Sequence, residues 1–407
     1  MDPAASAVAQ AEECAAPSEE SWFRTSSLVA ALHPAEARID AIAAEWLDLA
    51  RCASEANAFG EHWFVRSGIR HLAEPGEVRL LEVRDRGSLI GILPICIGRK
   101  YGRMPVRHVQ NWLHYHSLLG TPLVRAGHEQ DFWSAALDAL DANPWAPGFL
   151  HINGLVEHGP VHRGLAAAAW VRRRSCDTVH RAARALLESE LSPQAYYEQT
   201  VRKKKRKELK RLQNRLAEQG SVSYRRLRPD DDLDAWCDAY LALESAGWKG
   251  ELGSALARHS NTDAFFRELV HGAAAAGRLE MLRLELDGRV LAMLVNFITP
   301  PGSFSFKIAF DEEFARFSPG VLIQLENLQI LDNPQVGWMD SCAVEDHPMI
   351  NSLWAERRTI VRVTLPLAGL HRQTAFRLCR MAEDCWGAVK RLVPSNSNAS
   401  EDQTEDE

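Results

Sequence analysis

The sequence predicts an α/β protein with two similar domains in tandem, each with a mixed sheet flanked by helices. The chain has 407 residues, enough for two or three domains, and its 46% hydrophobic and 25% charged residues are typical of a globular protein. A strand–turn–strand pattern occurs at 78–97 and again at 279–298, with Gly87 and Gly288 at the two turns. Chance is the alternative, but the elements around both hairpins follow the same order, which favours a duplication.

The first half is expected to begin with helix, then strands, then a helix and a further strand. Residues 22–60 read as helical because Ile39, Ile42, Trp46 and Leu49 recur at helical spacing. The hairpin 78–97 follows. The later predicted elements are a strand at 107–113, a helix near 128–142 and a strand at 148–155.

The second half repeats this order, with helices predicted at 231–247 and 262–276 before the hairpin 279–298. A strand is expected at 303–310, then a helix at 318–331 with Pro319 in its first turn, and a short strand at 336–341. Strict alternation in 303–310 predicts one face with Phe304, Phe306, Ile308 and Phe310, and an opposite face with Ser305, Lys307 and Ala309.

The termini and the composition predict a cytoplasmic protein. Residues 1–21 and the acidic segment 391–407 read as disordered, which leaves predicted domains at 22–185 and 186–390. The first residues lack the features of a signal peptide, and no run of apolar residues is long enough for a membrane span. The eight cysteines contain no C-x-x-C pair and are expected to be reduced thiols.

Several segments of the second half resemble one family of bacterial proteins. They are "LALESAGWKGELGSAL" (241–256), "FFRELVHGAAAAGRLEMLRLELDGRVLAM" (265–293), "SFKIAFDEEFARFSPGVLI" (305–323) and "MDSCAVEDHPMINSLWAERR" (339–358). The chain resembles the CelD-like GNAT acetyltransferases, associated with cellulose biosynthesis. It is more distantly similar to the FemABX proteins, which carry two tandem GNAT-like domains. The resemblance covers most of 22–375.

The resemblance implies two tandem GNAT-like domains, with a non-catalytic first domain and a catalytic second one. The implied reaction transfers an acetyl or other acyl group from acyl-CoA to an amine, without a metal. The family's association suggests a small-molecule amine or amino-sugar acceptor linked to cellulose or exopolysaccharide. Two alternatives remain open: a FemABX-like transferase that uses aminoacyl-tRNA, and a catalytically silent accessory or scaffold protein of a polysaccharide synthase.

The predicted donor site is the start of the helix that follows strand 303–310. Arg316, Ser318, Pro319, Gly320 and Val321 occupy the positions of the family's pyrophosphate loop, but Pro319 and Val321 replace two of its small residues. Helix N-termini bind anions through unpaired N–H groups and the helix dipole. We therefore expect this segment to hold the pyrophosphate of coenzyme A, with Arg316 contacting a phosphate oxygen.

Three residues on the same two strands are predicted to be catalytic. Asp311 and Asp340 end strands that lie parallel and splay apart in the GNAT arrangement, so either carboxylate could accept the proton of an attacking amine. The alternative for both is turn capping. Lys307 lies mid-strand among apolar residues and could bind an acidic group or form a structural ion pair.

Other residues of the second half are candidates for substrate binding. Asn296 is a lone amide in an apolar strand, and it could face the thioester or satisfy a neighbouring backbone group. Trp248 and Lys249, in "GWKG", suit a substrate-facing loop, with a helix C-cap as the alternative. Asp346 lies in the last matching segment beside His347, which could act as acid or base or be an ordinary loop residue.

A basic segment at 202–215 is a candidate surface for a polyanion, either RNA or an anionic membrane. Leu209, Leu212 and Leu216 fall on one stripe of a predicted helix that Gly220 can end. A solvated basic face is the alternative, and no aromatic residue within the segment supports stacking on bases. His158 and His162 are separated by Gly159-Pro160, so no metal site is expected.

Overall fold

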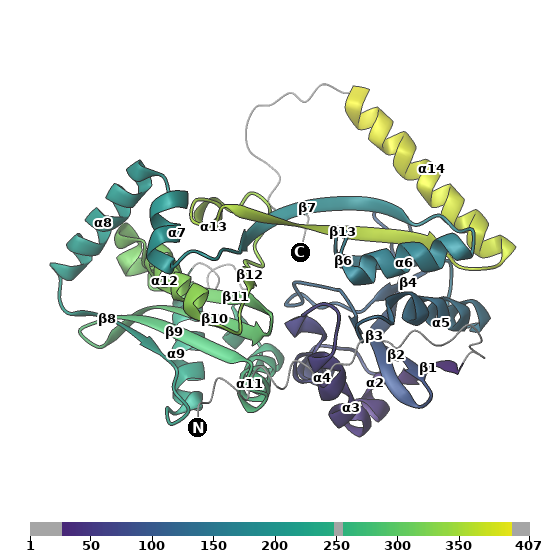
Figure 1. The fold of residues 1–407 in the computed structure, drawn as a ribbon, viewed down its shortest axis with the longest axis horizontal. Helices are drawn as coiled ribbons and strands as arrows, with labels where there is room; N and C mark the ends of the chain where they lie inside the picture. The colour runs from purple at the N-terminus through teal and green to yellow at the C-terminus, as the bar shows by residue number, and fades with distance from the viewer. Residues whose placement is uncertain (1–26, 248–254, 393–407) are drawn as a thin grey trace.

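The strands form one continuous 13-stranded sheet that runs through both halves of the molecule (Figure 1). This computed structural model describes residues 27–247 and 255–392. The strand order is β1-β2-β3-β4-β6-β13-β7-β12-β11-β10-β9-β8, and β5 pairs with β3. Read outward from the centre, the two halves of the sheet have the same order. The predicted mixed sheet flanked by helices is confirmed.

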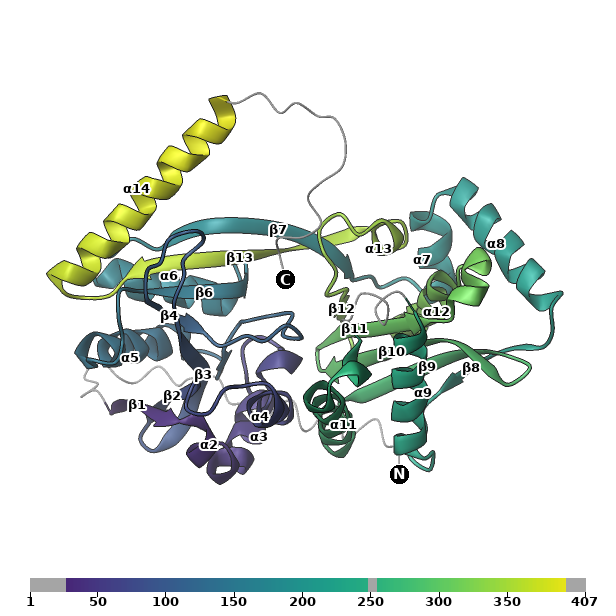
Figure 2. The same cartoon turned by 180° about the vertical axis from the view of Figure 1, so that it is seen from behind.

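Each half of the sheet contains one strand from the other half of the chain. The late strand β13 (Glu356–Pro366) pairs with β6 (Phe149–Val156) of the first half. Strand β7 (Asp177–Leu187) pairs with β12 (Trp338–Asp340) of the second half, and β7 and β13 pair antiparallel with each other. These two strands cross between the halves in Figures 1 and 2. The predicted domain boundary after residue 185 falls within β7, and the division stays a proposal.

The two hairpins match in their irregularities as well as in their lengths. Arg86-Gly87 and Asp287-Gly288 all have positive φ, the geometry of a tight hairpin turn. Ile90 has no partner in the register that pairs β2 with β3, and Leu291 has none in the register that pairs β9 with β10. A bulge at the same position of both hairpins supports the duplication inferred from the sequence.

In the first half, helices cover both faces of the sheet. Phe132, Trp133 and Leu165 of α5 and α6 are buried against one face, and Trp46 and Ile69 of α3 and α4 against the other. The other elements of this half are β1 (Leu28–Pro34), α2 (Ala35–Arg38), α3 (Ala43–Arg51), α4 (His62–His71), β2 (Arg79–Asp85), β3 (Ser88–Gly98), β4 (His108–Asn111), β5 (Leu123–Val124), α5 (Glu129–Ala142) and α6 (Pro160–Val171).

In the second half, α9 and α11 pack on one face of the sheet, and α8 and α12 on the other. Leu209, Leu212 and Leu216 of α8 are buried, as predicted. The elements are α7 (Pro193–Thr200), α8 (Lys203–Ala217), β8 (Val222–Arg226), α9 (Leu233–Ala246), α11 (Ser260–Ala275), β9 (Leu279–Leu286), β10 (Arg289–Thr299), β11 (Gly302–Phe310), the 3₁₀ helices η4 (Glu312–Phe317) and η5 (Asn327–Asp332), α12 (Pro319–Glu326), α13 (Pro348–Asn351) and the last helix α14 (Leu370–Leu392).

Two local predictions are wrong. Residues 28–34 form the edge strand β1 instead of helix, because they pair antiparallel with β2. The alternation expected for β11 is broken by an irregularity opposite Val295 and Asn296. As a result Phe304 and Phe306 pack with α9 and α11, whereas Ile308 and Phe310 pack on the α12 side.

The two halves share an aromatic core. Trp63 of α4 packs edge-on against Phe297 of β10, with ring centroids 4.9 Å apart. Phe59 packs in the same way against Phe304 of β11 at 5.3 Å. These rings come from both halves of the chain, and burying them together favours a fixed arrangement of the halves.

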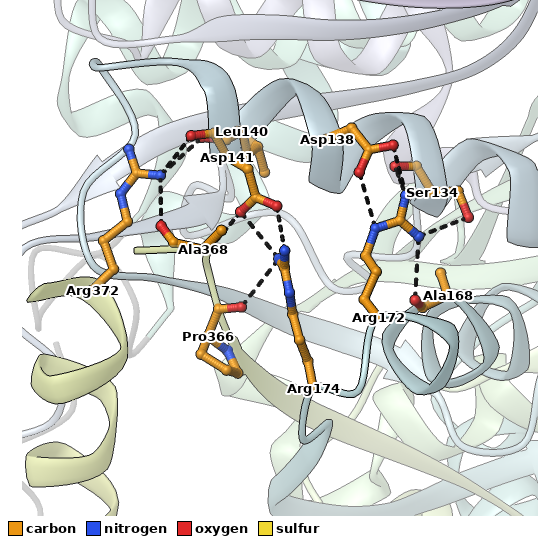
Figure 3. Close-up of polar contacts among 10 residues, drawn as sticks. All are labelled: Ser134, Asp138, Leu140, Asp141, Ala168, Arg172, Arg174, Pro366, Ala368 and Arg372. Atoms are coloured by element: carbon orange, nitrogen blue, oxygen red, sulfur yellow. Dashed lines mark hydrogen bonds and ion pairs between the residues drawn. The ribbon is translucent and has the colours of Figure 1, made fainter. Parts of the chain in front are cut away.

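The start of α14 is tied to the first half by arginine side chains (Figure 3). Arg372 donates to the backbone carbonyls of Asp141 at 2.9 Å and Asn143 at 3.0 Å. Arg174 pairs with the Asp141 carboxylate, which also accepts from the backbone N–H of Ala368 at 2.6 Å. Within the described part of the chain, no helix has the length and hydrophobicity needed to cross a membrane.

Candidate functional site

The two parallel strands of the second half separate after three residue pairs. Strands β11 and β12 pair from Gly302–Trp338 to Phe304–Asp340, and β11 then continues to Phe310 without β12 beside it. The parallel pairing therefore ends where β12 ends, at Asp340. A cavity of about 270 Å³ lies at the end of β11, lined by Leu243, Glu244, Gly247, Ile308, Ala309, Phe310, Glu312, Gly320, His347 and Met349.

The first turn of α12 forms one wall of this cavity. Ser318 has left-handed backbone angles, φ 53° and ψ 55°, and its carbonyl accepts from the N–H groups of Val321 at 2.9 Å and Leu322 at 3.1 Å. Pro319 has no N–H, so this turn offers an anion fewer donors than an ordinary helix start. Gly320 is buried, and a Cβ there would lie 3.3 Å from the Phe310 ring. Glycine therefore keeps the cavity open beside β11.

Three side chains that can take or give a proton line the cavity. Glu244 is buried and accepts from the backbone N–H of Leu256 at 2.9 Å. Glu312 comes from η4 and approaches Gly247. His347 is half-buried at the start of α13, where its Nδ1 lies 3.5 Å from the backbone nitrogen of Ile350. Sequence reasoning missed Glu244 and Glu312, although Glu244 stands out as a charged residue on the buried stripe of α9.

Asp340, predicted to be catalytic, lies among largely buried arginine side chains. Its carboxylate is fully buried and lies 2.7 Å from both Nε and Nη2 of Arg184, with Nη1 of Arg358 at 3.3 Å. Arg184 also donates to the carbonyl of Leu118 in the first half at 2.6 Å. Both carboxylate oxygens are thus engaged by arginine side chains inside the protein, where a substrate amine cannot reach them. Asp340 instead joins β7, β12 and β13 where the two halves meet.

The neighbouring Cys342 is not suited to nucleophilic chemistry. Its backbone N–H donates to Oδ1 of Asp340 at 2.9 Å. Burial and the charge of Asp340 raise the pKa of the Cys342 thiol, so the thiol stays protonated near neutral pH.

The other two residues predicted to be catalytic lie outside the cavity lining. Asp311 accepts from the backbone N–H of Glu313 at 3.1 Å at the start of η4, and pairs with Arg289 at 2.6 Å. This matches the capping alternative. Lys307 is half-buried, with its Nζ 5.4 Å from the centroid of the Phe306 ring, and its charge helps to lower the pKa of His114. Lys307 therefore lies toward the first half.

The predicted substrate residues are dispersed. Asn296 is fully buried and donates to Glu280 at 2.9 Å and Asn327 at 2.8 Å, so its amide belongs to a core network. Asp346 is exposed on the loop after β12, and Arg316 is exposed with its guanidinium 4.8 Å from the Phe317 ring centroid. Trp248 and Lys249 lie outside the described residues.

A second and larger cavity, about 620 Å³, lies between α8 and the α12–η5 segment. Lys203, Arg206, Lys207 and Lys210 of α8 line it, so the basic surface predicted at 202–215 faces a groove. Tyr197 of α7 and Tyr224 of β8 line the same groove. The fold thus adds aromatic side chains that the basic segment itself lacks. We call this surface the basic groove.

The continuous sheet, the short parallel pair of β11 and β12 and the helix that starts at Pro319 agree with an acyltransferase fold of the GNAT type. Residues 203–340 match the family model described as "Acetyltransferase (GNAT) domain". This segment contains β11, β12, α12 and most of the cavity lining. It supports the enzyme class expected from the sequence, an acyltransferase. Among curated proteins, none matches the sequence.

Solved structures share the fold over both halves. FemX is 10% identical with a TM-score of 0.55, and the similarity covers 83% of this chain and 98% of that one. The C-terminal domain of a putative lysylphosphatidylglycerol synthetase from Agrobacterium fabrum is 10% identical with a TM-score of 0.50, covering 83% and 96%. A conserved protein of unknown function from Bacteroides thetaiotaomicron is 12% identical with a TM-score of 0.50, covering 81% and 97%. At these identities the similarity shows the fold.

Proposed function

We propose that this chain transfers an acyl group from acyl-CoA to an amine, with the cavity at the end of β11 as the donor site. The observation that carries the proposal is the cavity beside the unpaired end of β11, which has Gly320 in the first turn of α12 as part of its lining. The amine attacks the thioester carbonyl, a C–N bond forms and the C–S bond breaks. The amine gives up a proton, and the CoA thiolate takes one.

The donor's diphosphate is proposed to lie over Ser318, Pro319 and Gly320, with Arg316 and Val321 at the edges of the site. Gly320 allows a close approach to the backbone because it has no Cβ. Arg316 is exposed and can turn from the Phe317 ring to a phosphate oxygen.

The proton acceptor is proposed to be His347, with Glu244 and Glu312 nearby on the cavity wall. For Nε2 of His347 to accept a proton from the amine, the neutral ring must carry its own proton on Nδ1. This tautomer gives up the long contact of 3.5 Å in which Nδ1 accepts from the Ile350 N–H. This assignment replaces Asp340, whose oxygens are held by two arginines.

Calorimetric titration with acetyl-CoA tests the donor site. The parent should bind, Gly320→Val should bind at least tenfold more weakly, and the exposed Gly337→Val should bind like the parent. His347→Gln should keep donor binding and lower turnover by about 10²-fold, the lower end of general acid–base effects. No detectable binding by the folded parent would overturn the acyl-CoA proposal and favour the scaffold alternative.

The acceptor is proposed to be a small amine or amino sugar, and a cytoplasmic role in cellulose or exopolysaccharide metabolism rests on the CelD-like resemblance alone. A cavity of about 410 Å³ between the halves is a candidate entrance. Residues 343–345 of the loop after β12 line this cavity, and His347 and Met349 line the donor cavity. One loop therefore separates the two spaces.

The basic groove favours a second candidate, an aminoacyl-tRNA-dependent transferase. A groove that combines four cationic side chains with two tyrosines suits a phosphate backbone and unstacked bases. Lys207→Glu with Lys210→Glu should weaken tRNA binding at least tenfold, and parent binding should fall steeply with salt.

The matched control is Lys204→Glu with Arg211→Glu, an equal charge change on exposed positions of α8 that do not line the groove. Equal losses in the two double variants would indicate non-specific attraction, and no binding of tRNA by the parent would remove this candidate.

A further inference from the structure

The outward face of α14 carries large apolar side chains. Leu378 is 60% exposed and Met381 is 63% exposed, while Phe376 and Cys379 on the opposite side are buried against Tyr101 and Phe149. Figures 1 and 2 show the helix pointing away from the sheet toward its C-terminal end. Its inner side is held as far as Arg380, which pairs with Asp177 of β7 at 3.1 Å, and Glu383, which accepts from Tyr101 at 3.2 Å. The contacts in Figure 3 fix only the start of α14 and its neighbouring helices. The outward stripe is therefore left without cover by the described part of the chain.

The spacing of this stripe is that of a helix-pairing seam. His371, Thr374, Leu378, Met381 and Cys385 are separated by three and four residues in turn, and in the sequence Ala388 and Leu392 continue the pattern. An alternation of three and four is the heptad repeat of coiled coils, in which each seam residue packs between residues of a facing helix. This regularity suits a second helix better than a flat surface.

The residues beside the seam complement their own copies when two α14 helices run antiparallel. Placing a twofold axis between Cys379 and Arg380 sets Leu378 against Met381 of a second copy. The same alignment sets Arg377 against Asp384 on one flank, twice by symmetry. On the other flank it sets Ala375 against Ala382, which lets the helices approach. A parallel pair would lose both Arg–Asp contacts, because the flank with Arg377 and Asp384 would then face the other flank, which carries no acidic or basic residue at 375 or 382.

The seam lies on the side of α14 that faces away from the rest of its own chain. Phe376 and Cys379, which face the first half of their own chain, lie on the side of α14 opposite the seam. A twofold pair along the seam therefore places the two bodies on outer sides of the helix pair. Such an interface, with one patch used by both copies, is the commonest form of protein dimer.

We propose that α14 is the dimerisation element of this protein, pairing antiparallel with α14 of a second copy through the seam from His371 to Cys385. The pairing does not depend on the proposed acyl transfer.

Sedimentation of the full chain tests the pairing. The parent should show a concentration-dependent dimer, and Met381→Glu should raise the dimer dissociation constant at least tenfold. Arg377→Asp should also weaken the dimer, whereas Arg377→Asp combined with Asp384→Arg should restore it. Gln373→Glu, away from the seam, is the control. A parent that remains monomeric at high concentration, or that floats with anionic vesicles as a monomer, would overturn the proposal.

Cross-linking separates the two orientations. Under mild oxidation by diamide, Thr374→Cys should form a disulfide-linked dimer through Cys385 of the other copy, because these positions face each other in the antiparallel pair. Adding Cys385→Ser should abolish it. A covalent dimer of the parent through Cys385 on both copies would indicate a parallel pair and contradict the alignment.

Discussion

The two halves share one framework and differ where their parallel strands separate. In the second half, β11 runs past β12 and leaves a cavity of about 270 Å³ beside Gly320. In the first half, β4 and β6 pair in parallel over Val109–Leu150 and Gln110–His151, at the corresponding place in the sheet. Here a loop of the chain packs between the ends of the strands, and the cavity of about 410 Å³ lies beside it.

This loop contains Gly120. The amide of Asn111 donates to the carbonyls of Gly120 at 3.1 Å and Asn153 at 2.8 Å, and the N–H of Gly120 donates to the carbonyl of Gly154 at 2.9 Å. A Cβ on Gly120 would lie 1.9 Å from the Asn153 carbonyl oxygen. The start of a helix thus forms one wall of the cavity in the second half, whereas a loop that is hydrogen-bonded to both strands forms the wall in the first half. This difference supports the proposal that only the second half is catalytic.

The largest expected loss of stability comes from removing the charge of Asp340, whose ion pairs lie where the two halves meet. Asp340→Asn keeps the shape of the side chain but leaves Arg184 and Arg358 buried without a counter-charge. We expect a loss of about 3–5 kcal/mol in the free energy of unfolding, measured with urea, since removing one partner of a buried ion pair strands the other. The partly exposed Asp311→Asn should cost about 1 kcal/mol or less. A fully stable Asp340→Asn variant with lost turnover would return Asp340 to the role of base.

The second prediction concerns the loss of stability at low pH, because the histidines His114 and His151, whose pKa values are lowered by burial, lie in the first half. Burial, aided by the charge of Lys307, lowers the pKa of His114 to about 3 from its ordinary 6.5. Between these values the unfolded chain binds a proton that the folded chain does not, so stability must fall as the pH falls through this range. The contribution of His114 should be a loss of about 2–3 kcal/mol between pH 6.5 and 4.5.

The measurement is urea unfolding at both pH values. His114→Gln should reduce the acid-induced loss in the free energy of unfolding. An unchanged acid response in a folded His114→Gln variant would contradict the assignment. His151 should then be tested, because burial lowers its pKa to about 4.

The smallest expected differences in stability come from substituting one glycine in each half by alanine. Gly120→Ala should cost about 1–3 kcal/mol, the usual range for forcing atoms into a packed site, because its neighbour is backbone. Gly320→Ala should change stability by about 0.5 kcal/mol or less, since the new methyl group faces the cavity and meets only side chains, the Phe310 ring at 3.3 Å and Ile308 at 3.6 Å. Thermal unfolding of the two variants measures the difference, and equal losses would show that the two openings are alike.

The hairpins, β11, β12 and the start of α12 could be predicted because hydrophobic spacing and turn residues are local signals. The crossing strands β7 and β13 could not, since Arg181, Arg184, Arg358 and Arg362 interrupt their apolar pattern. The role of Asp340 depends on Arg184, which is 156 residues away in the sequence. A pattern read along one segment contains no information on such a partner. Glu244, by contrast, could have been found as a carboxylate on a buried helical stripe.

The exchange of β7 and β13 has a consequence for synthesis on the ribosome. Strand β6 ends at Val156, and its partner β13 begins only at Glu356. One edge of β6 therefore stays unpaired until β13 has been synthesised. At about 5–20 residues per second, the ribosome needs roughly 10–40 s to make the chain between them. During that time the nascent first half carries an unpaired strand edge, the kind of surface on which neighbouring chains of a polysome associate. Translation speed through the second half should therefore influence how much of the protein reaches its native state.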